Sequence, residues 1–180
     1  MKAGLRERAA AARDAAHRMV DSEVARWHLT EALAPWRRRP LAGYLPIRSE
    51  IDPRPVMAAW PGPVGVPEIV AKGAPLRFVR WHPEAELQTG TFAVDVPVGA
   101  EELVPEVLIV PLLAFDGIGG RLGYGGGFYD RTLAALRRAG DVIAIGFAYA
   151  AQEFDEVPLE PTDIMLDAVV TEQGIRWFPR

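Results

Sequence analysis

The amino-acid sequence predicts an α/β fold, a single three-layer domain with a mainly parallel central sheet flanked by helices. Three observations support this prediction: helical patterns fill about residues 2–34, strand and helix signals alternate through about 41–180, and neither a repeat nor a low-complexity linker interrupts the chain. With 180 residues, of which 49% are hydrophobic, the chain is long enough to bury one core. We therefore expect one domain that spans residues 1–180.

The N-terminal part is predicted to form two helices. Apolar residues recur at three- and four-residue spacing in both, as Leu5, Ala9, Ala12 and Ala16 in the first and as Ala25, Leu29, Ala32 and Leu33 in the second. Ser22 is a good N-cap for the second helix. Pro35 and the run 37–40, three arginines and a proline, are expected to end it.

The elements of the core follow in an alternating order. Residues 107–110 are four consecutive aliphatic residues between prolines, which predicts a strand that is buried on both faces and central in the sheet. One helix is expected to start at Asp52 and Pro53, because aspartate caps free N–H groups and proline suits the first helical position. Another should cover about 128–138 and end near Gly140 in a left-handed conformation. The remaining predicted strands are 41–47, 64–70, 76–81, 142–147 and 166–171.

Composition excludes several classes of function. The net charge of −4 provides no basic field for nucleic acid, and the absence of cysteine excludes a disulfide framework, a thiolate zinc site and a cysteine nucleophile. No apolar run approaches the ~18 residues of a membrane span, and the charged N-terminus does not resemble a signal peptide. We expect a cytoplasmic protein that binds neither nucleic acid nor membrane.

A glycine-dense stretch lies between the buried strand and the next helix. Gly123 and the glycines at 125–127 allow backbone N–H groups to approach a ligand, and the start of the helix adds partial positive charge. This pattern predicts an anion site, most often for phosphate, with Arg121 and Arg131 able to pair with phosphate oxygens and Asp130 able to hold Mg²⁺. The alternatives are a tight turn that packs on the sheet and, for Asp130, a charge that caps the helix.

Two familiar phosphate-binding patterns are missing from this stretch. It contains no G-x-x-x-x-G-K-[ST], so it is not a P-loop. No register of its glycines gives G-x-G-x-x-G, the pattern of dinucleotide-binding folds. Neither a dinucleotide-binding fold nor a Walker ATPase is therefore supported.

Residues 111–133 resemble the signature of the 5-formyltetrahydrofolate cyclo-ligase family, above all in 114–116 and 121–131. Weaker similarities extend over nearly the whole chain, at 2–6, 49–52, 66–67, 75–78, 81, 161–163 and 166–172. The resemblance implies ATP-dependent closure of 5-formyltetrahydrofolate to 5,10-methenyltetrahydrofolate, with ADP and phosphate released and Mg²⁺ as cofactor. The partners are then the folate and ATP, and we expect a monomer or a weak homodimer.

Two other functions remain open at this point. A non-catalytic paralogue would bind folate or nucleotide without turnover. A sugar-phosphate isomerase of related layered architecture would also use a glycine loop for phosphate but would need no nucleotide.

The resemblance also implies roles for individual residues. The ATP-binding residues are Lys2, Arg6, Arg121, Leu122, Gly123, Tyr124, Gly125, Gly126, Gly127, Phe128 and Tyr129, and the catalytic candidates among them are Arg121 and Tyr129. The folate-binding residues are Leu45, Glu50, Tyr124, Gly125, Gly126, Gly127 and Phe128, and the magnesium ligands are Asp130 and Asp163. Without the resemblance, Lys2 and Arg6 are more typical of a solvated helix face than of a binding site, and Glu50 would be an ordinary acid of an exposed loop.

Three positions depart from the family pattern. Thr162 stands where many members carry histidine, Val96 and Pro97 stand where Glu-Pro is frequent, and Gly126 stands where some members place a lysine. These departures concern substrate affinity and metal geometry, and none of them removes the glycine loop.

Overall fold

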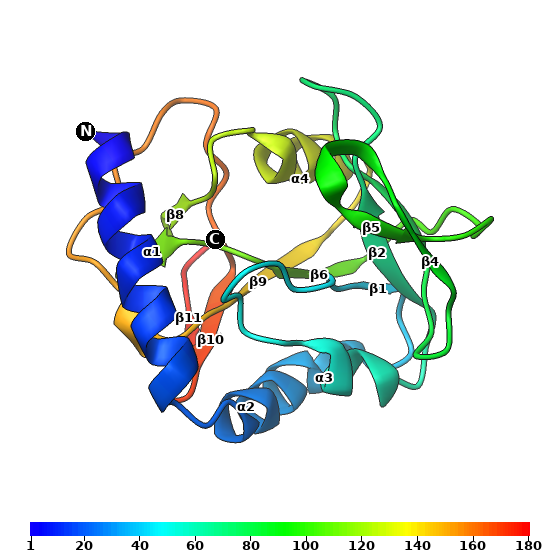
Figure 1. Cartoon of the computed structure of the whole chain (residues 1–180), viewed down its shortest axis with the longest axis horizontal. Coiled ribbons are helices and arrows are strands. Elements are labelled where there is room, and N and C mark those ends of the chain that lie inside the picture. The colour runs from blue at the N-terminus through cyan, green and yellow to red at the C-terminus, as the bar shows by residue number, and fades with distance from the viewer.

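The computed structural model describes all residues, 1–180, and arranges them in layers around a central sheet (Figure 1). The helices are α1 (Lys2–Met19), α2 (Glu23–Leu33), α3 (Arg54–Ala58) and α4 (Phe128–Ala139), and short 3₁₀ turns cover Ala34–Trp36, Thr91–Ala93 and Ala150–Gln152. The strands are β1 (Leu41–Ala42), β2 (Val64–Glu68), β3 (Arg77–Arg80), β4 (Leu87–Thr89), β5 (Asp95–Pro97), β6 (Val107–Val110), β7 (Ala114–Phe115), β8 (Arg121–Leu122), β9 (Ile143–Phe147), β10 (Ala168–Thr171) and β11 (Gly174–Trp177).

The central sheet has seven strands in the order β11-β10-β9-β6-β1-β2-β3. The strands between the two edges all run parallel, and each edge strand is antiparallel to its neighbour. The prediction of a mainly parallel sheet is therefore confirmed. β6 lies in the middle, as the four aliphatic residues of its sequence predicted, because a strand covered on both faces needs apolar side chains at every position.

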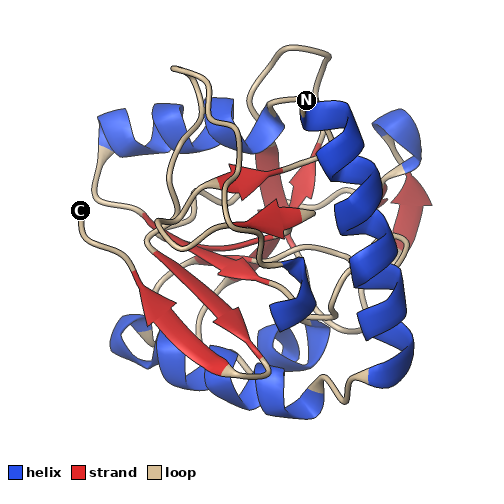
Figure 2. Ribbon diagram, turned by 90° about the vertical axis from the view of Figure 1, so that its left-hand side faces the viewer, coloured by secondary structure: helices blue, strands red, loops and turns tan.

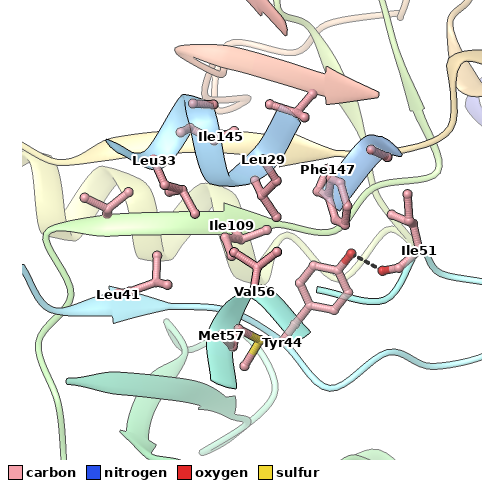
Figure 3. Close-up of a cluster of buried hydrophobic side chains, with 14 of the residues drawn as sticks. Leu29, Leu33, Leu41, Tyr44, Ile51, Val56, Met57, Ile109, Ile145 and Phe147 are labelled. Atoms are coloured by element: carbon pink, nitrogen blue, oxygen red, sulfur yellow. Dashed lines mark hydrogen bonds between the residues drawn. The ribbon is translucent and has the colours of Figure 1, made fainter. Parts of the chain in front are cut away.

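Helices cover both faces of the sheet. Val107 and Ile109 of β6 belong to the core cluster that includes α2 and α3, whereas Leu108 and Val110 belong to the cluster that includes α4. This alternation follows from the two-residue period of a strand. Figure 3 shows the larger cluster, in which Leu29 and other apolar side chains of α2 point toward the strands.

Helix α1 stands at one end of the layers and packs on the small β7–β8 hairpin (Figures 1 and 2). Ala9 of α1 is fully buried there with Ala114 and Leu122 of the hairpin. The contact brings the start of the chain beside the glycine-dense stretch, which follows β8 directly. None of the helices combines the length and the apolar character that a membrane crossing needs.

Two predicted details are wrong, and several short strands were not predicted. The strand expected over 41–47 ends at Ala42, because the chain turns at Ile47–Glu50, where Arg48 has a φ of 53° and the Glu50 N–H donates to the Ile47 carbonyl over 3.1 Å. Gly140 is extended rather than left-handed, with a φ of −178°, because the chain runs straight on toward β9. The short strands β4, β5, β7, β8 and β11 had no distinct sequence signal.

Candidate active site

A large cavity of 1410 Å³ opens at the carboxyl ends of the parallel strands. Strand β1 connects to its neighbour β2 on one side, whereas the adjacent β6 connects onward to β9 on the other side. Connections that leave two adjacent strands in opposite directions open a crevice, which is where parallel α/β sheets bind their ligands. The cavity lies there, lined by Tyr44 after β1, Pro67 in β2 and Pro111 after β6.

The glycine loop forms one wall of the cavity. It leaves the β7–β8 hairpin, whose turn is fixed by buried Asp116: Oδ1 accepts hydrogen bonds from the N–H groups of Ile118 and Gly120. Gly125 and Gly127 have φ values of 102° and 67°, in the left-handed region that favours glycine. Gly127 is the N-cap of α4, so the first free N–H groups of that helix point toward the cavity side of the loop.

Helix α1 supplies two cationic side chains to the same cavity. Arg6 donates from Nε to the carbonyl oxygen of Gly123 over 2.9 Å, and Lys2 donates to Oδ2 of Asp163 over 3.0 Å and lies 3.2 Å from Glu160. Burial lowers the pKa of Lys2, but its hydrogen bonds to Asp163 and Glu160 outweigh this effect and raise the pKa above its usual value. Lys2 is therefore charged at neutral pH.

Arg121 and Tyr129 carry buried polar atoms without a partner. The Arg121 guanidinium donates from Nη2 to Asp130 Oδ2 over 3.0 Å and lies 5.7 Å from the centre of the Tyr129 ring. Its Nε and the Tyr129 hydroxyl make no hydrogen bond, although both atoms are buried and both residues line the cavity. Buried polar atoms without partners are uncommon in folded proteins, so these two favour a ligand that accepts hydrogen bonds. Burial raises the pKa of Tyr129, which keeps the hydroxyl neutral and able to donate.

Glu50 also lines the cavity and is 5% exposed. Its Oε2 accepts from the Ile47 N–H over 2.9 Å, and its Oε1 accepts from the Tyr124 hydroxyl over 3.1 Å. Burial raises the pKa of this carboxyl above its usual value, although the Ile47 N–H, Arg13, Tyr124 and Arg48 act in the opposite direction. A carboxylate in this position can accept paired hydrogen bonds from amino and ring N–H groups of a ligand.

Tyr124 joins the glycine loop to Glu50. Two guanidinium groups lie close to its ring, with Arg48 at 5.1 Å and Arg13 at 5.6 Å from the ring centre, and Arg13 donates to its hydroxyl over 2.6 Å. Cations over an aromatic face are attracted by the ring electrons. Arg13 of α1 and Arg48 of the turn after β1 thus hold the glycine loop at Tyr124.

Asp130 and Asp163 provide the hard oxygen ligands that suit Mg²⁺, and both line the cavity. The N–H of Ile164, the residue after Asp163, donates to Asp130 Oδ1 over 2.9 Å, so the two segments are in contact. The chain holds no group of three or more metal-ligating side chains. Mg²⁺ is usually held by one or two carboxylates together with water and substrate phosphates, so this donor set fits it beside a phosphate site.

All sequence-predicted site residues border this one cavity: Lys2, Arg6, Leu45, Glu50, the residues 121–130 and Asp163. Of the departures, Thr162 and Gly126 line it, whereas Val96 is buried in β5 and is not part of its wall. Arg131 also lines it but donates to the carbonyl of Gly126 over 2.6 Å, so its first role is to hold the loop.

Sequence reasoning missed Arg13 and Arg48. Arg13 follows Arg6 by seven residues, a spacing that returns to the same helix face, and this signal was available. Arg48 had no such signal, because its position depends on the left-handed backbone of the turn.

Comparison with known proteins gives consistent matches. A 105-residue segment is 41% identical to the 5-formyltetrahydrofolate cyclo-ligase of Escherichia coli K12, and a 96-residue segment is 36% identical to that of Haemophilus influenzae. The first segment covers 56% of this chain and 57% of the E. coli protein, so the chain matches little more than half the length of these relatives. The second covers 51% of each.

Solved structures match over a longer range. The NMR structure of Aquifex aeolicus 5,10-methenyltetrahydrofolate synthetase superimposes with a TM-score of 0.77 and 26% identity, over 99% of this chain and 93% of that one. A synthetase from Mycoplasma pneumoniae has a TM-score of 0.72 at 20% identity, which shows the shared fold. The sequence profile of the 5-formyltetrahydrofolate cyclo-ligase family matches residues 1–172, and the chain belongs to that family.

Proposed function

We propose that this protein catalyses the ATP-dependent cyclisation of 5-formyltetrahydrofolate to 5,10-methenyltetrahydrofolate, with release of ADP and phosphate. One observation carries the proposal: the glycine loop, with the features of an anion site, and the buried Glu50 line one cavity. The reaction needs both parts, because a triphosphate and a pterin must lie in contact.

The glycine loop with α1 forms the ATP side in this proposal. Loop N–H groups, Arg6 and Arg121 would contact phosphate oxygens, and Lys2 would add a further charge. Tyr129 would donate its unpartnered hydroxyl to the transferring group. Phosphoryl transfer depends on alignment and charge stabilisation more than on a protein nucleophile, so the lack of cysteine is no obstacle.

Glu50 and Leu45 form the folate side. The carboxylate would accept hydrogen bonds from the pterin amino and ring N–H groups, while Leu45 and Tyr124 would pack against the ring system. Glu50 is held by the Ile47 N–H and Tyr124, so its orientation is set before the folate arrives.

The chemistry has two steps. The formyl oxygen attacks the γ-phosphorus of ATP, ADP leaves, and the formyl carbon becomes electrophilic. The neighbouring folate nitrogen N10 then attacks this carbon and loses its proton to solvent, and the C–O bond breaks, so the former formyl oxygen departs in the phosphate. Both reacting groups of the second step belong to one bound molecule, which favours closure by proximity.

Asp130 and Asp163 would hold Mg²⁺ in this scheme. The ion would supply charge neutralisation for the β- and γ-phosphates. Lys2 and Arg121 currently pair with these two carboxylates, and both cations would then be shared with the nucleotide.

A spectrophotometric assay tests the proposal. Purified protein with 5-formyltetrahydrofolate, ATP and Mg²⁺ should accumulate the absorbing methenyl product, and omission of ATP should abolish it. With substrate that carries oxygen-18 in the formyl group, the label should appear in the released phosphate. Binding of both ligands without product would instead indicate the non-catalytic paralogue. Family membership gives no support to the sugar-phosphate isomerase.

A further inference from the structure

Arg13 of α1 is a buried cation outside the wall of the cavity. Its side chain is 2% exposed, yet it carries a full charge, and it is not among the residues that line the cavity. A buried charge is costly unless hydrogen bonds and an opposite charge compensate it. The contacts of Arg13 must therefore compensate the cost of burying its charge.

The contacts of Arg13 converge on the folate side of the site. Nε donates to Ser49 Oγ over 3.0 Å, and Nη1 donates to the Tyr124 hydroxyl over 2.6 Å and lies 4.0 Å from Glu50 Oε1. The Tyr124 hydroxyl in turn donates to the same Glu50 oxygen. One side chain thus joins α1, the turn after β1 and the glycine loop.

The geometry requires the forked shape of arginine. Two different nitrogens of one planar group reach acceptors on two separate segments, and the same group faces the Tyr124 ring at 5.6 Å. Lysine has a single ammonium group and cannot make these contacts together.

Glu50 depends on this arrangement because it is buried. The charged and titratable groups that face it are Arg13, Arg48, Tyr124, Tyr44 and Tyr129. Arg13 and Arg48 are the cations among them, and of these two only Arg13 hydrogen-bonds the hydroxyl that contacts the carboxylate. Loss of Arg13 would leave the Glu50 charge less compensated and Tyr124 free to leave its place.

We infer that Arg13 is a positioning residue for the folate end of the site, which acts by holding Tyr124 and the Glu50 side chain in place; this inference rests on the proposed function. Arg6 lies on the same face of α1 and contacts the glycine loop on the ATP side. Helix α1 would therefore contribute to the ATP site through Arg6 and to the folate site through Arg13.

Steady-state kinetics of Arg13→Lys test the inference. The KM for 5-formyltetrahydrofolate should rise about 10-fold or more, as is typical when an outer contact of a ligand-binding group is lost, whereas the KM for ATP should change less than about 2-fold. The matched control is Arg18→Lys, on the same helix but exposed, which should change neither value. Equal KM values for the folate in Arg13→Lys and Arg18→Lys would overturn the inference.

A second pair of variants covers the case in which Arg13→Lys does not fold. Ser49→Ala and Tyr124→Phe each remove one partner of Arg13 and leave its charge in place. The folate KM should rise more in Tyr124→Phe, which also removes the direct hydrogen bond to Glu50, and the two effects should be less than additive in the double variant, since they share the Arg13 guanidinium. Additive effects, or none, would overturn the inference. Absence of turnover in the unmodified protein would instead refute the proposed function.

Discussion

Lys2 and Asp163 form an ion pair of 3.0 Å across 161 positions of sequence. The pair joins the first turn of α1 to the loop before β10, and both residues border the cavity. The Lys2 ammonium group contacts the Asp163 carboxylate in this structure. In the proposed complex with ATP it would contact a nucleotide phosphate.

Replacement of Lys2 by methionine should therefore weaken ATP binding. We expect the KM for ATP to rise about 10-fold at low salt and less at high salt, because ions screen a partly exposed charge. The chain has one other lysine, Lys72, which is exposed and outside the cavity, so Lys72→Met is the matched control. A similar ATP KM in both variants would contradict the assignment.

Arg121→Gln should lower turnover by about 10²-fold or more, as losses of other electrostatic contacts to a transition state do. The buried Nε without a partner is the group expected to reach the phosphoryl oxygens. Arg77→Gln, which breaks an exposed ion pair with Glu68, should leave kcat unchanged. Unchanged kcat in Arg121→Gln would remove this residue from the site.

Asp130→Asn should raise the Mg²⁺ concentration needed for half-maximal activity. The amide oxygen can still accept from the Ile164 N–H, so the fold should persist while the negative charge is lost. Titration of activity with Mg²⁺ measures the effect. Asp141→Asn, at an exposed pair with Arg180, is the control and should titrate like the unmodified protein.

Glu50 should make both stability and folate binding depend on pH. Burial raises the pKa of Glu50 in the folded state, so its contribution to stability is fully present below the ordinary glutamate pKa of about 4.3 and is lost as pH rises through the raised value. Folate binding has the opposite dependence, because the ionised form accepts the pterin N–H groups. Glu50→Gln should remove this part of the pH dependence of unfolding and should weaken folate binding at neutral pH. Parallel unfolding curves against pH in both proteins would contradict the assignment.

Leu29→Ala should destabilise the fold by about 2–5 kcal/mol, the usual cost of a truncated core leucine. Leu29 is fully buried between α2 and the sheet (Figure 3). Urea unfolding measures the change. Val24→Ala on the exposed side of the same helix should alter the free energy of unfolding by less than about 0.5 kcal/mol.

Much of the fold follows from local patterns in the sequence. The four aliphatic residues of β6 predicted its central place, and the apolar stripe of α2 predicted its buried face, because burial alone determines both patterns. The left-handed backbone at Arg48 and the early end of β1 depend on contacts with distant segments. No local pattern carries that information.

The site residues could be predicted where their segment of sequence resembles the family signature. Residues outside such segments could not. The residues 121–131 resemble a family signature, and the structure places them in the lining of one cavity together with Lys2, Glu50 and Asp163. Arg13 has the same local sequence character as the solvated arginines of its helix. Its seven-residue spacing from Arg6 is the one local signal, and its contact with Tyr124, 111 positions away, is what separates it from them in the structure.

The attachment of α1 to the rest of the molecule has a consequence for protease resistance. Lys2 and Arg6 bind the 160–163 segment and the glycine loop through a few polar contacts, so a nucleotide that shares these contacts would hold the first helix against both segments. Saturation with ATP should then slow cleavage within the first helix, and limited digestion would report occupancy of the cavity without any turnover.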